Sequence, residues 1–124
     1  MKKEAIYIIS FYLKNNDEII RKDNIESKIK KDELLFEINK DKYKINLSKF
    51  ILNKDNNEST LNFIFDDKKE TKGTYYIKDM NFYMDARIKT NKLIYKDNKL
   101  DIDYELYLQD EYIGKFRLKI TVKE

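Results

Sequence analysis

Apolar residues fall on every second position near the end of the chain, and this alternation constrains the fold more than any other feature. Two runs carry it, Leu100, Ile102, Tyr104, Leu106 and Leu108 followed by Phe116, Leu118, Ile120 and Val122. A period of two places apolar side chains on one face of a β-strand and polar side chains on the other. The two runs therefore predict adjacent antiparallel strands with one buried face.

The residues between these apolar positions carry opposite charges in the two runs. The first run has Asp101, Asp103 and Glu105 on its outer face, and the second has Lys115, Arg117 and Lys119. Opposite charges that face each other across a strand pair contribute roughly 0.2–1 kcal/mol each. The acidic row is thus interpreted as a solvated face that meets basic partners, and not as a catalytic or metal-binding group.

Two connections between these strands fit the pattern. A three-residue loop at residues 110–112 pairs Leu106 with Phe116 and Tyr104 with Leu118. It also sets Glu105 beside Arg117 and Asp103 beside Lys119 on the outer face. The alternative is a two-residue turn at Gln109-Asp110 with one extra residue after Ile113, for which Gly114 is the natural bulge site.

Upstream of these strands, Asp97-Asn98 predicts another tight turn, because both residue types tolerate positive φ. It pairs Tyr95 with Leu100 and Leu93 with Ile102 on one face. Before it the apolar residues occupy even positions, and after Thr90-Asn91 they occupy odd ones. This change of phase predicts a bulge near Thr90-Asn91 that curves the sheet.

The first half of the chain contains further strand-like segments. Residues 5–13 are interpreted as a first strand and not as a secretory signal, because polar residues interrupt the apolar run. Residues 18–31 favour a strand over a helix. In the strand reading, a turn at Asp32-Glu33 pairs Ile29 with Phe36 and Ser27 with Ile38.

The remaining segments are separated by clusters of Asn, Asp and Lys at hairpin spacing. Strands are expected over residues 34–38, 43–52, 58–65 and 70–78, with a change of phase near Ser48-Lys49 and a turn at Asp66-Asp67. Residues 1–124 are therefore expected to form one domain, a single antiparallel up-and-down β-barrel of eight or nine strands. None of the segments is long enough to cross a membrane as a helix, so a cytoplasmic location is expected.

Composition removes most familiar catalytic chemistry. The 124 residues contain no cysteine, no histidine and no proline, and only two glycines. Thiol nucleophiles, imidazole catalysis, Cys/His zinc sites and glycine-rich phosphate loops are therefore missing. We expect a protein that is not an enzyme and uses no metal or cofactor. The net charge of +3 is spread along the chain, so nucleic-acid binding is not expected.

The final runs resemble the C-terminal part of the bacterial YwiB-like family. The resemblance covers residues 88–93 and 100–108, Ile113 and residues 116–124, and it is weaker elsewhere. That family is a domain of unknown function, and the resemblance implies a calycin-like, lipocalin-like barrel. It supplies no catalytic residues.

A barrel of this size leaves a lumen that side chains fill or that holds one small ligand. Inward parity makes Phe82, Met84, Tyr104 and Phe116 the candidate lumen residues. Because these side chains are large, a filled lumen is expected, with a partner still needed for the Tyr104 hydroxyl. Two functions remain open: a non-catalytic interaction module acting as a monomer or homodimer with a protein partner, and a carrier of a small apolar ligand.

Overall fold

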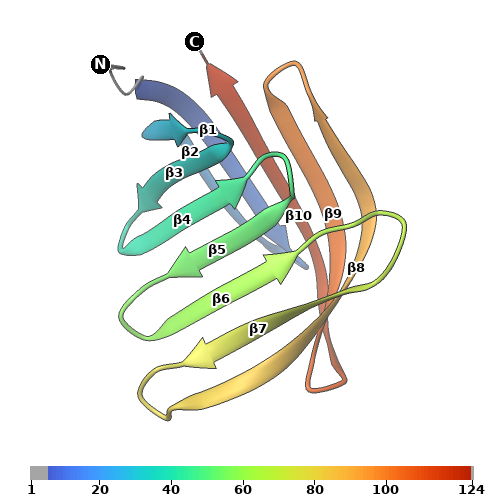
Figure 1. Cartoon of the computed structure of the whole chain (residues 1–124). Coiled ribbons are helices and arrows are strands. Elements are labelled where there is room, and N and C mark those ends of the chain that lie inside the picture. The colour runs from blue at the N-terminus through green and yellow to red at the C-terminus, as the bar shows by residue number, and fades with distance from the viewer. Residues whose placement is uncertain (1–5, 124) are drawn as a thin grey trace.

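The computed structural model describes residues 6–123, and these residues form a closed antiparallel barrel (Figure 1). Each strand pairs with its neighbours in the chain, and β1 closes the barrel against β10. The strands are β1 (Ile6–Asn15), β2 (Glu18–Lys30), β3 (Glu33–Ile38), β4 (Asp41–Asn46), β5 (Ile51–Asp55), β6 (Ser59–Ile64), β7 (Thr71–Ile77), β8 (Phe82–Lys96), β9 (Lys99–Leu108) and β10 (Glu111–Lys123). The predicted all-β up-and-down barrel is confirmed, with ten strands in the described range where eight or nine were expected.

The additional strand comes from the segment 43–52, which was predicted as one strand and forms parts of two. The Asn46 carboxamide oxygen accepts the amide N–H groups of Ser48 and Lys49 at 3.0 and 2.8 Å. The Phe50 amide donates to the Asn46 carbonyl at 2.9 Å, and Phe50 has a φ of 56°. The change of phase near Ser48-Lys49 is therefore a complete turn between β4 and β5, and the prediction of one continuous strand was wrong.

Residues 18–30 form strand β2, which confirms the strand reading, but the predicted pairing with β3 was wrong by two residues. Ser27 pairs with Phe36 and Ile29 with Leu34. The turn lies one residue earlier than expected, because Lys31 adopts the positive φ of 57° that the tight turn needs. The faces are unchanged, since a shift of two residues preserves the alternation.

The hairpin of β8 and β9 confirms the prediction made for it. Asp97 and Asn98 have φ values of 54° and 60°, and the pairs Tyr95 with Leu100 and Leu93 with Ile102 form as expected. The pairing shifts register between Thr90 and Lys92. The change of phase in the sequence therefore marks a real bulge.

The hairpin of β9 and β10 uses the two-residue turn, so the pairing expected from a three-residue loop was wrong. Gln109 and Asp110 have φ values of 51° and 64°. Tyr104 pairs with Phe116, and the register shifts between Tyr112 and Gly114. The bulge at Ile113-Gly114 thus restores the inward phase of the second half of β10.

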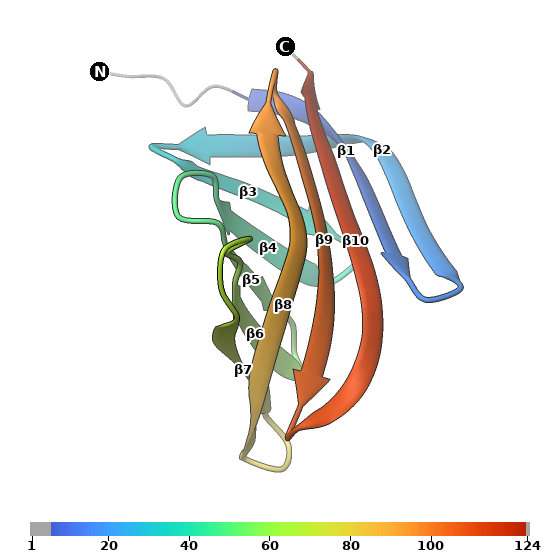
Figure 2. The same ribbon diagram turned by 90° about the vertical axis from the view of Figure 1, so that its right-hand side faces the viewer.

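The long strands β8, β9 and β10 curve past a layer made by the shorter strands β3 to β7 (Figures 1 and 2). Between them lies the buried core, which includes Ile9, Phe11, Leu34, Phe63, Ile88, Ile102, Leu118 and Ile120. Figure 2 shows the tip of the β1–β2 hairpin standing apart from β3 to β7. Within residues 6–123 there is no helix with the length and apolar character needed to cross a membrane. Residues 1–5, which bear on the signal-peptide alternative, lie outside the described residues.

Acidic and basic rows meet on the outer face of β8, β9 and β10. Asp101 lies 3.0 Å from Lys92 and 3.3 Å from Arg117, and Arg117 also lies 3.3 Å from Asp103. Burial of the Asp101 carboxyl acts to raise its pKa, but hydrogen bonds from Arg117 and Lys92 outweigh burial and lower the pKa. The opposite charges seen in the sequence therefore stabilise this part of the wall.

We predict that Gly73→Ala destabilises the barrel although Ala suits a strand better than Gly. Gly73 pairs with Phe63 on β6 and Ala86 on β8. A methyl group there would meet the carbonyl oxygen of Asn62, and would come within 3.0 Å of the Phe63 ring. The free energy of unfolding should fall by about 1–3 kcal/mol in urea melts. Lys72→Ala, at the exposed neighbouring position, is the control and should change it little.

We predict that Asp101→Asn lowers the free energy of unfolding by about 1 kcal/mol at neutral pH. A carboxyl whose pKa is lowered by folding stabilises the protein above its unfolded pKa of about 3.9, and this contribution is lost as the pH falls through the folded value. The difference between wild type and variant should therefore shrink in melts from pH 7 to acid. Asp79→Asn, an exposed turn residue, is the control. A difference that does not change with pH would contradict the charge assignment.

Candidate ligand-binding site

The barrel encloses a cavity of about 500 Å³ at one end of its lumen. Its wall draws on the inner faces of most strands, and its residues are mainly aliphatic and aromatic. The lining residues are Phe11, Leu13, Asn15, Glu18, Ile20, Tyr43, Leu52, Lys54, Leu61, Phe63, Tyr75, Ile77, Met84, Tyr104, Leu106, Leu108, Ile113, Phe116 and Leu118.

Side chains fill the other end of the lumen. Ile9, Leu34 and Ile88 have no exposed surface there. An aromatic cluster separates this packed end from the cavity: the ring centroids of Phe11 and Tyr43 are 5.3 Å apart, and those of Phe36 and Tyr43 are 4.9 Å apart in a stacked arrangement. The expected filled lumen is therefore found at one end of the barrel only.

The structure brings three of the four candidate lumen residues to the cavity. Met84, Tyr104 and Phe116 line it. Phe82 has the same inward parity but is 44% exposed and does not line the cavity. It is the first residue of β8 and pairs with Ile77 beside the β7–β8 turn, which places it at the rim of the barrel.

Several lining residues were not found from the sequence. Ile113 has the same parity as the outward residues Lys115 and Arg117, and reaches the cavity because the bulge at Gly114 reverses its direction. Ile20 lies on β2, and its inward parity was hidden because Ile19 beside it is also apolar. The Gly114 bulge was the signal from which the role of Ile113 could have been derived.

Two tyrosines with largely buried side chains line the cavity, and neither hydroxyl forms a hydrogen bond within residues 6–123. Tyr104 is 4% exposed and Tyr43 is 8% exposed. Burial, and next the proximity of Tyr43, raise the pKa of Tyr104, and burial followed by Asp41 raises the pKa of Tyr43 to about 12. Both hydroxyls therefore keep their protons at neutral pH and can donate a hydrogen bond.

Other polar groups lie around the same cavity. The Asn15 carboxamide oxygen is buried and has no partner within the described residues. Lys54 also lines the cavity, and its ammonium group lies 3.7 Å from the Asp41 carboxylate and 5.9 Å from the centroid of the Tyr43 ring. The site thus combines an apolar wall with a few polar groups, which is the usual composition of small-molecule pockets.

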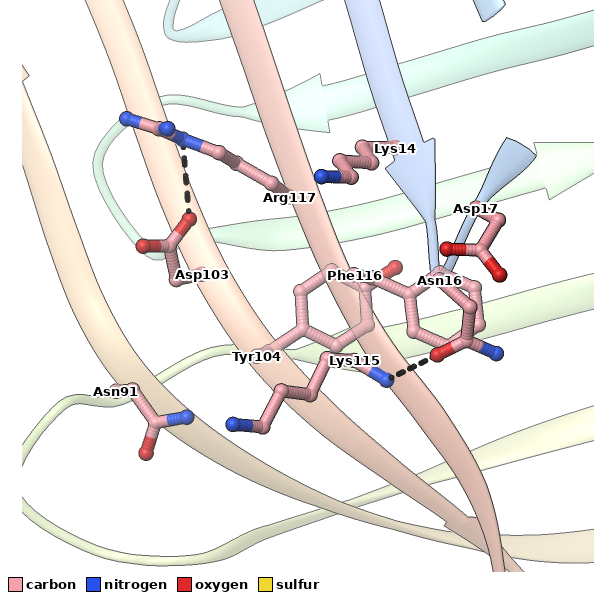
Figure 3. Close-up of a pocket in the computed structure, with 9 residues that line it drawn as sticks. All are labelled: Lys14, Asn16, Asp17, Asn91, Asp103, Tyr104, Lys115, Phe116 and Arg117. Carbon is pink, nitrogen blue, oxygen red and sulfur yellow. Dashed lines mark hydrogen bonds and ion pairs between the residues drawn. The ribbon is translucent and has the colours of Figure 1, made fainter. Parts of the chain in front are cut away.

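A second, polar groove of about 480 Å³ lies on the outside of β10 and beside the β1–β2 turn (Figure 3). Arg117 in this groove forms an ion pair with Asp103, as Figure 3 shows. Asn16 accepts a hydrogen bond from the Lys115 amide at 3.2 Å. The stacked rings of Tyr104 and Phe116, 5.2 Å apart, line both the groove and the lumen cavity. The lumen cavity remains the better candidate because its wall is apolar.

Carboxylates singled out in the sequence form hydrogen bonds and ion pairs within the fold. Asp66 accepts a hydrogen bond from the Lys68 amide at 2.9 Å in the turn after β6, as its interpretation as a turn residue predicted. Within residues 6–123 there is no group of three or more Asp or Glu side chains that could hold a metal ion.

Comparisons with known proteins agree with this fold. The model of a family described as a domain of unknown function, DUF1934, matches residues 10–120. The crystal structure of the ywiB protein from Bacillus subtilis superposes with a TM-score of 0.53 at 9% identity, over 96% of this chain and 91% of that one. No curated protein matches the sequence. The resemblance to the YwiB-like family found in the C-terminal strands is confirmed.

We predict that the two phenylalanines Phe65 and Phe116, whose rings both contact the Tyr104 ring, differ in their contribution to stability. Phe65 is 3% exposed, lies 4.8 Å from the Tyr104 ring and does not line the cavity, whereas Phe116 is only partly buried and does. Phe65→Ala should lower the free energy of unfolding by about 3–5 kcal/mol, and Phe116→Ala by about half as much, in urea melts. Equal losses would show that Phe116 is packed as tightly as a core residue.

Proposed function

We propose, from the premise that the chain belongs to the DUF1934 family of unknown function, that it binds one small and mostly apolar molecule in its lumen. The observation that carries the proposal is the cavity lined by apolar side chains, together with two lining tyrosines whose hydroxyls form no hydrogen bond among residues 6–123. The proposal keeps the non-catalytic role and the cytoplasmic location expected from the sequence.

The size of the cavity supports a single small ligand. Its volume of about 500 Å³ lies within the range of about 300–1,000 Å³ typical of small-molecule pockets. Apolar side chains such as Leu61, Leu106 and Met84 would contact the body of the molecule. Their burial against a ligand would supply the binding free energy, at roughly 25 cal/mol per Å² of apolar surface.

The tyrosine hydroxyls suggest the polar part of the ligand. A tyrosine hydroxyl that lines an apolar cavity can donate a hydrogen bond to a ligand oxygen, and such a bond contributes about 0.5–1.5 kcal/mol. Tyr43 and Tyr104 offer two such donors, and Lys54 adds a cation beside Tyr43. We infer a ligand with an apolar body and a hydrogen-bond acceptor such as a hydroxyl, carbonyl or carboxylate oxygen.

An interaction module is the second candidate, and one surface favours it. Met80, Phe82 and Tyr83 lie at the β7–β8 hairpin and are 70%, 44% and 62% exposed. Tyr83 stacks on Tyr76 with ring centroids 4.3 Å apart. Exposed apolar groups that gather in one place often contact a partner. None of Tyr76, Met80, Phe82 and Tyr83 lines the cavity, so the two functions can be tested separately.

We predict that Leu108→Trp fills the cavity and abolishes ligand binding. Native mass spectrometry of protein purified without added ligand should show a retained small molecule in the wild type and none in the variant. The fluorescence of 1-anilinonaphthalene-8-sulfonate should rise with the wild type and much less with Leu108→Trp. Ile94→Trp, on the exposed outer face of β8, is the matched control and should behave like the wild type.

Tyr104→Phe separates the polar contact from the apolar one. It should weaken binding of straight-chain alcohols and carboxylic acids about ten-fold while leaving the unfolding free energy nearly unchanged, because no protein hydrogen bond is lost. Tyr107→Phe, whose ring packs on the outer face with Tyr112, is the control. Absence of a retained molecule, together with equal dye fluorescence of the wild type and Leu108→Trp, would overturn the lumen proposal and leave the interaction module.

A further inference from the structure

One edge of the barrel wall is left unpaired in the N-terminal half of β2. The strand pairs with β1 from Glu18 onward, but β3 pairs only with residues 27–30. Asn24 has a φ of 58°, and the pairing with β1 shifts register between Ile9 and Phe11. β2 therefore bends at this point, and its residues 18–22 extend with β1 as an arm whose outer edge has no strand partner among residues 6–123.

The backbone groups on this edge can be identified from the pairing. The Asn16 amide donates to the Lys115 carbonyl on β10, so the even-numbered residues at this end of β1 bond to β10 and the odd-numbered ones to β2. Leu13 and Asn15 face Ile20 and Glu18. The N–H and C=O groups of residues 19 and 21 consequently point to the free edge, where they are available to another strand.

The arm carries side chains that suit a second strand. Ile19 and Ile20 are 58% and 52% exposed, although they are adjacent and lie on opposite faces. Glu18 and Lys22 are exposed on the same face as Ile20, and within residues 6–123 neither forms an ion pair. An exposed strand edge with apolar side chains is a template for pairing with another strand.

We propose that two copies of this chain associate by antiparallel pairing of these β2 edges, with Ile20 of each copy opposite Ile20 of the other. In this register residues 19 and 21 form the hydrogen-bonded pairs, in agreement with the groups that point outward. Glu18 of each copy then faces Lys22 of the other, which gives two opposite-charge pairs related by the two-fold axis. The sequence of the arm is thus complementary to itself.

Neighbouring registers are less favourable. A shift of two residues in one direction places Arg21 opposite Arg21. A shift in the other direction leaves only residues 18–20 paired within the strand, because Arg21 then faces Asp17 in the turn. The hairpin tip stands apart from strands β3 to β7, so a second chain can approach the edge (Figure 2). The inference does not rest on a ligand in the lumen.

A charge exchange at positions 18 and 22 tests this register. Glu18→Lys places two like-charged pairs in the interface, and Lys22→Glu does the same with the opposite sign. For each variant alone, the dissociation constant of the dimer, measured by sedimentation velocity, should be roughly ten-fold or more above that of the wild type. An equimolar mixture of the two variants should form a heterodimer of wild-type strength, because every pair is again of opposite charge.

Arg21→Pro tests the role of the backbone. It removes a donor on the free edge but none of the bonds between β1 and β2, so the circular-dichroism spectrum should stay that of the wild type while the dimer is lost. Glu18→Lys combined with Lys22→Glu in one chain should dimerise like the wild type. A wild type that stays monomeric at all soluble concentrations, or a mixture that forms no heterodimer, would overturn the proposal.

Discussion

The pairing of β1 with β10 is the contact on which the rest of the structure depends. It runs from Ile8 opposite Lys123 to Asn15 opposite Phe116, and joins the two ends of the described chain. Every other pairing is between chain neighbours and forms without a long loop. Closure also removes the two outermost sheet edges, β1 and β10, that an open meander would expose.

Closure of the barrel beside the β1–β2 turn depends on Gly114 in β10. The Asn16 side-chain oxygen accepts a hydrogen bond from the Lys115 amide, and the carboxamide nitrogen and oxygen of Asn16 lie 2.6 Å from the place that a Cβ on Gly114 would occupy. Glycine is therefore the residue that lets the β1–β2 tip approach the bulge. The same bulge turns Ile113 toward the cavity, so one irregularity shapes both the barrel seam and the candidate site.

The alternation of the sequence was enough to predict the barrel, because period-two patterns are fixed by the backbone alone. It also predicted the Asp97-Asn98 turn and the bulge near Thr90-Asn91 in the correct places. It did not predict the position of the turn before β3 or the break at Ser48-Lys49, since positive φ at Lys31 and Phe50 is unusual for those residue types. The lining of the cavity could not be predicted from the sequence. Phe82 and Met84 share the same inward parity, and what distinguishes them is their distance from the end of the barrel, which the alternation does not give.

Two departures from alternation locate the features that the pattern missed. Ile19 and Ile20 are both apolar on an arm that pairs on one side only, and Ile113 is apolar at an outward parity. In a strand covered on one face, an apolar residue on the outward parity is either turned inward by a bulge or left exposed on the outer face. Gly114 provides the bulge for Ile113. The arm of β2 has no equivalent bulge between Ile19 and Ile20, so the side chain of Ile19 stays on the outer face, where it is 58% exposed beside the free edge of the strand.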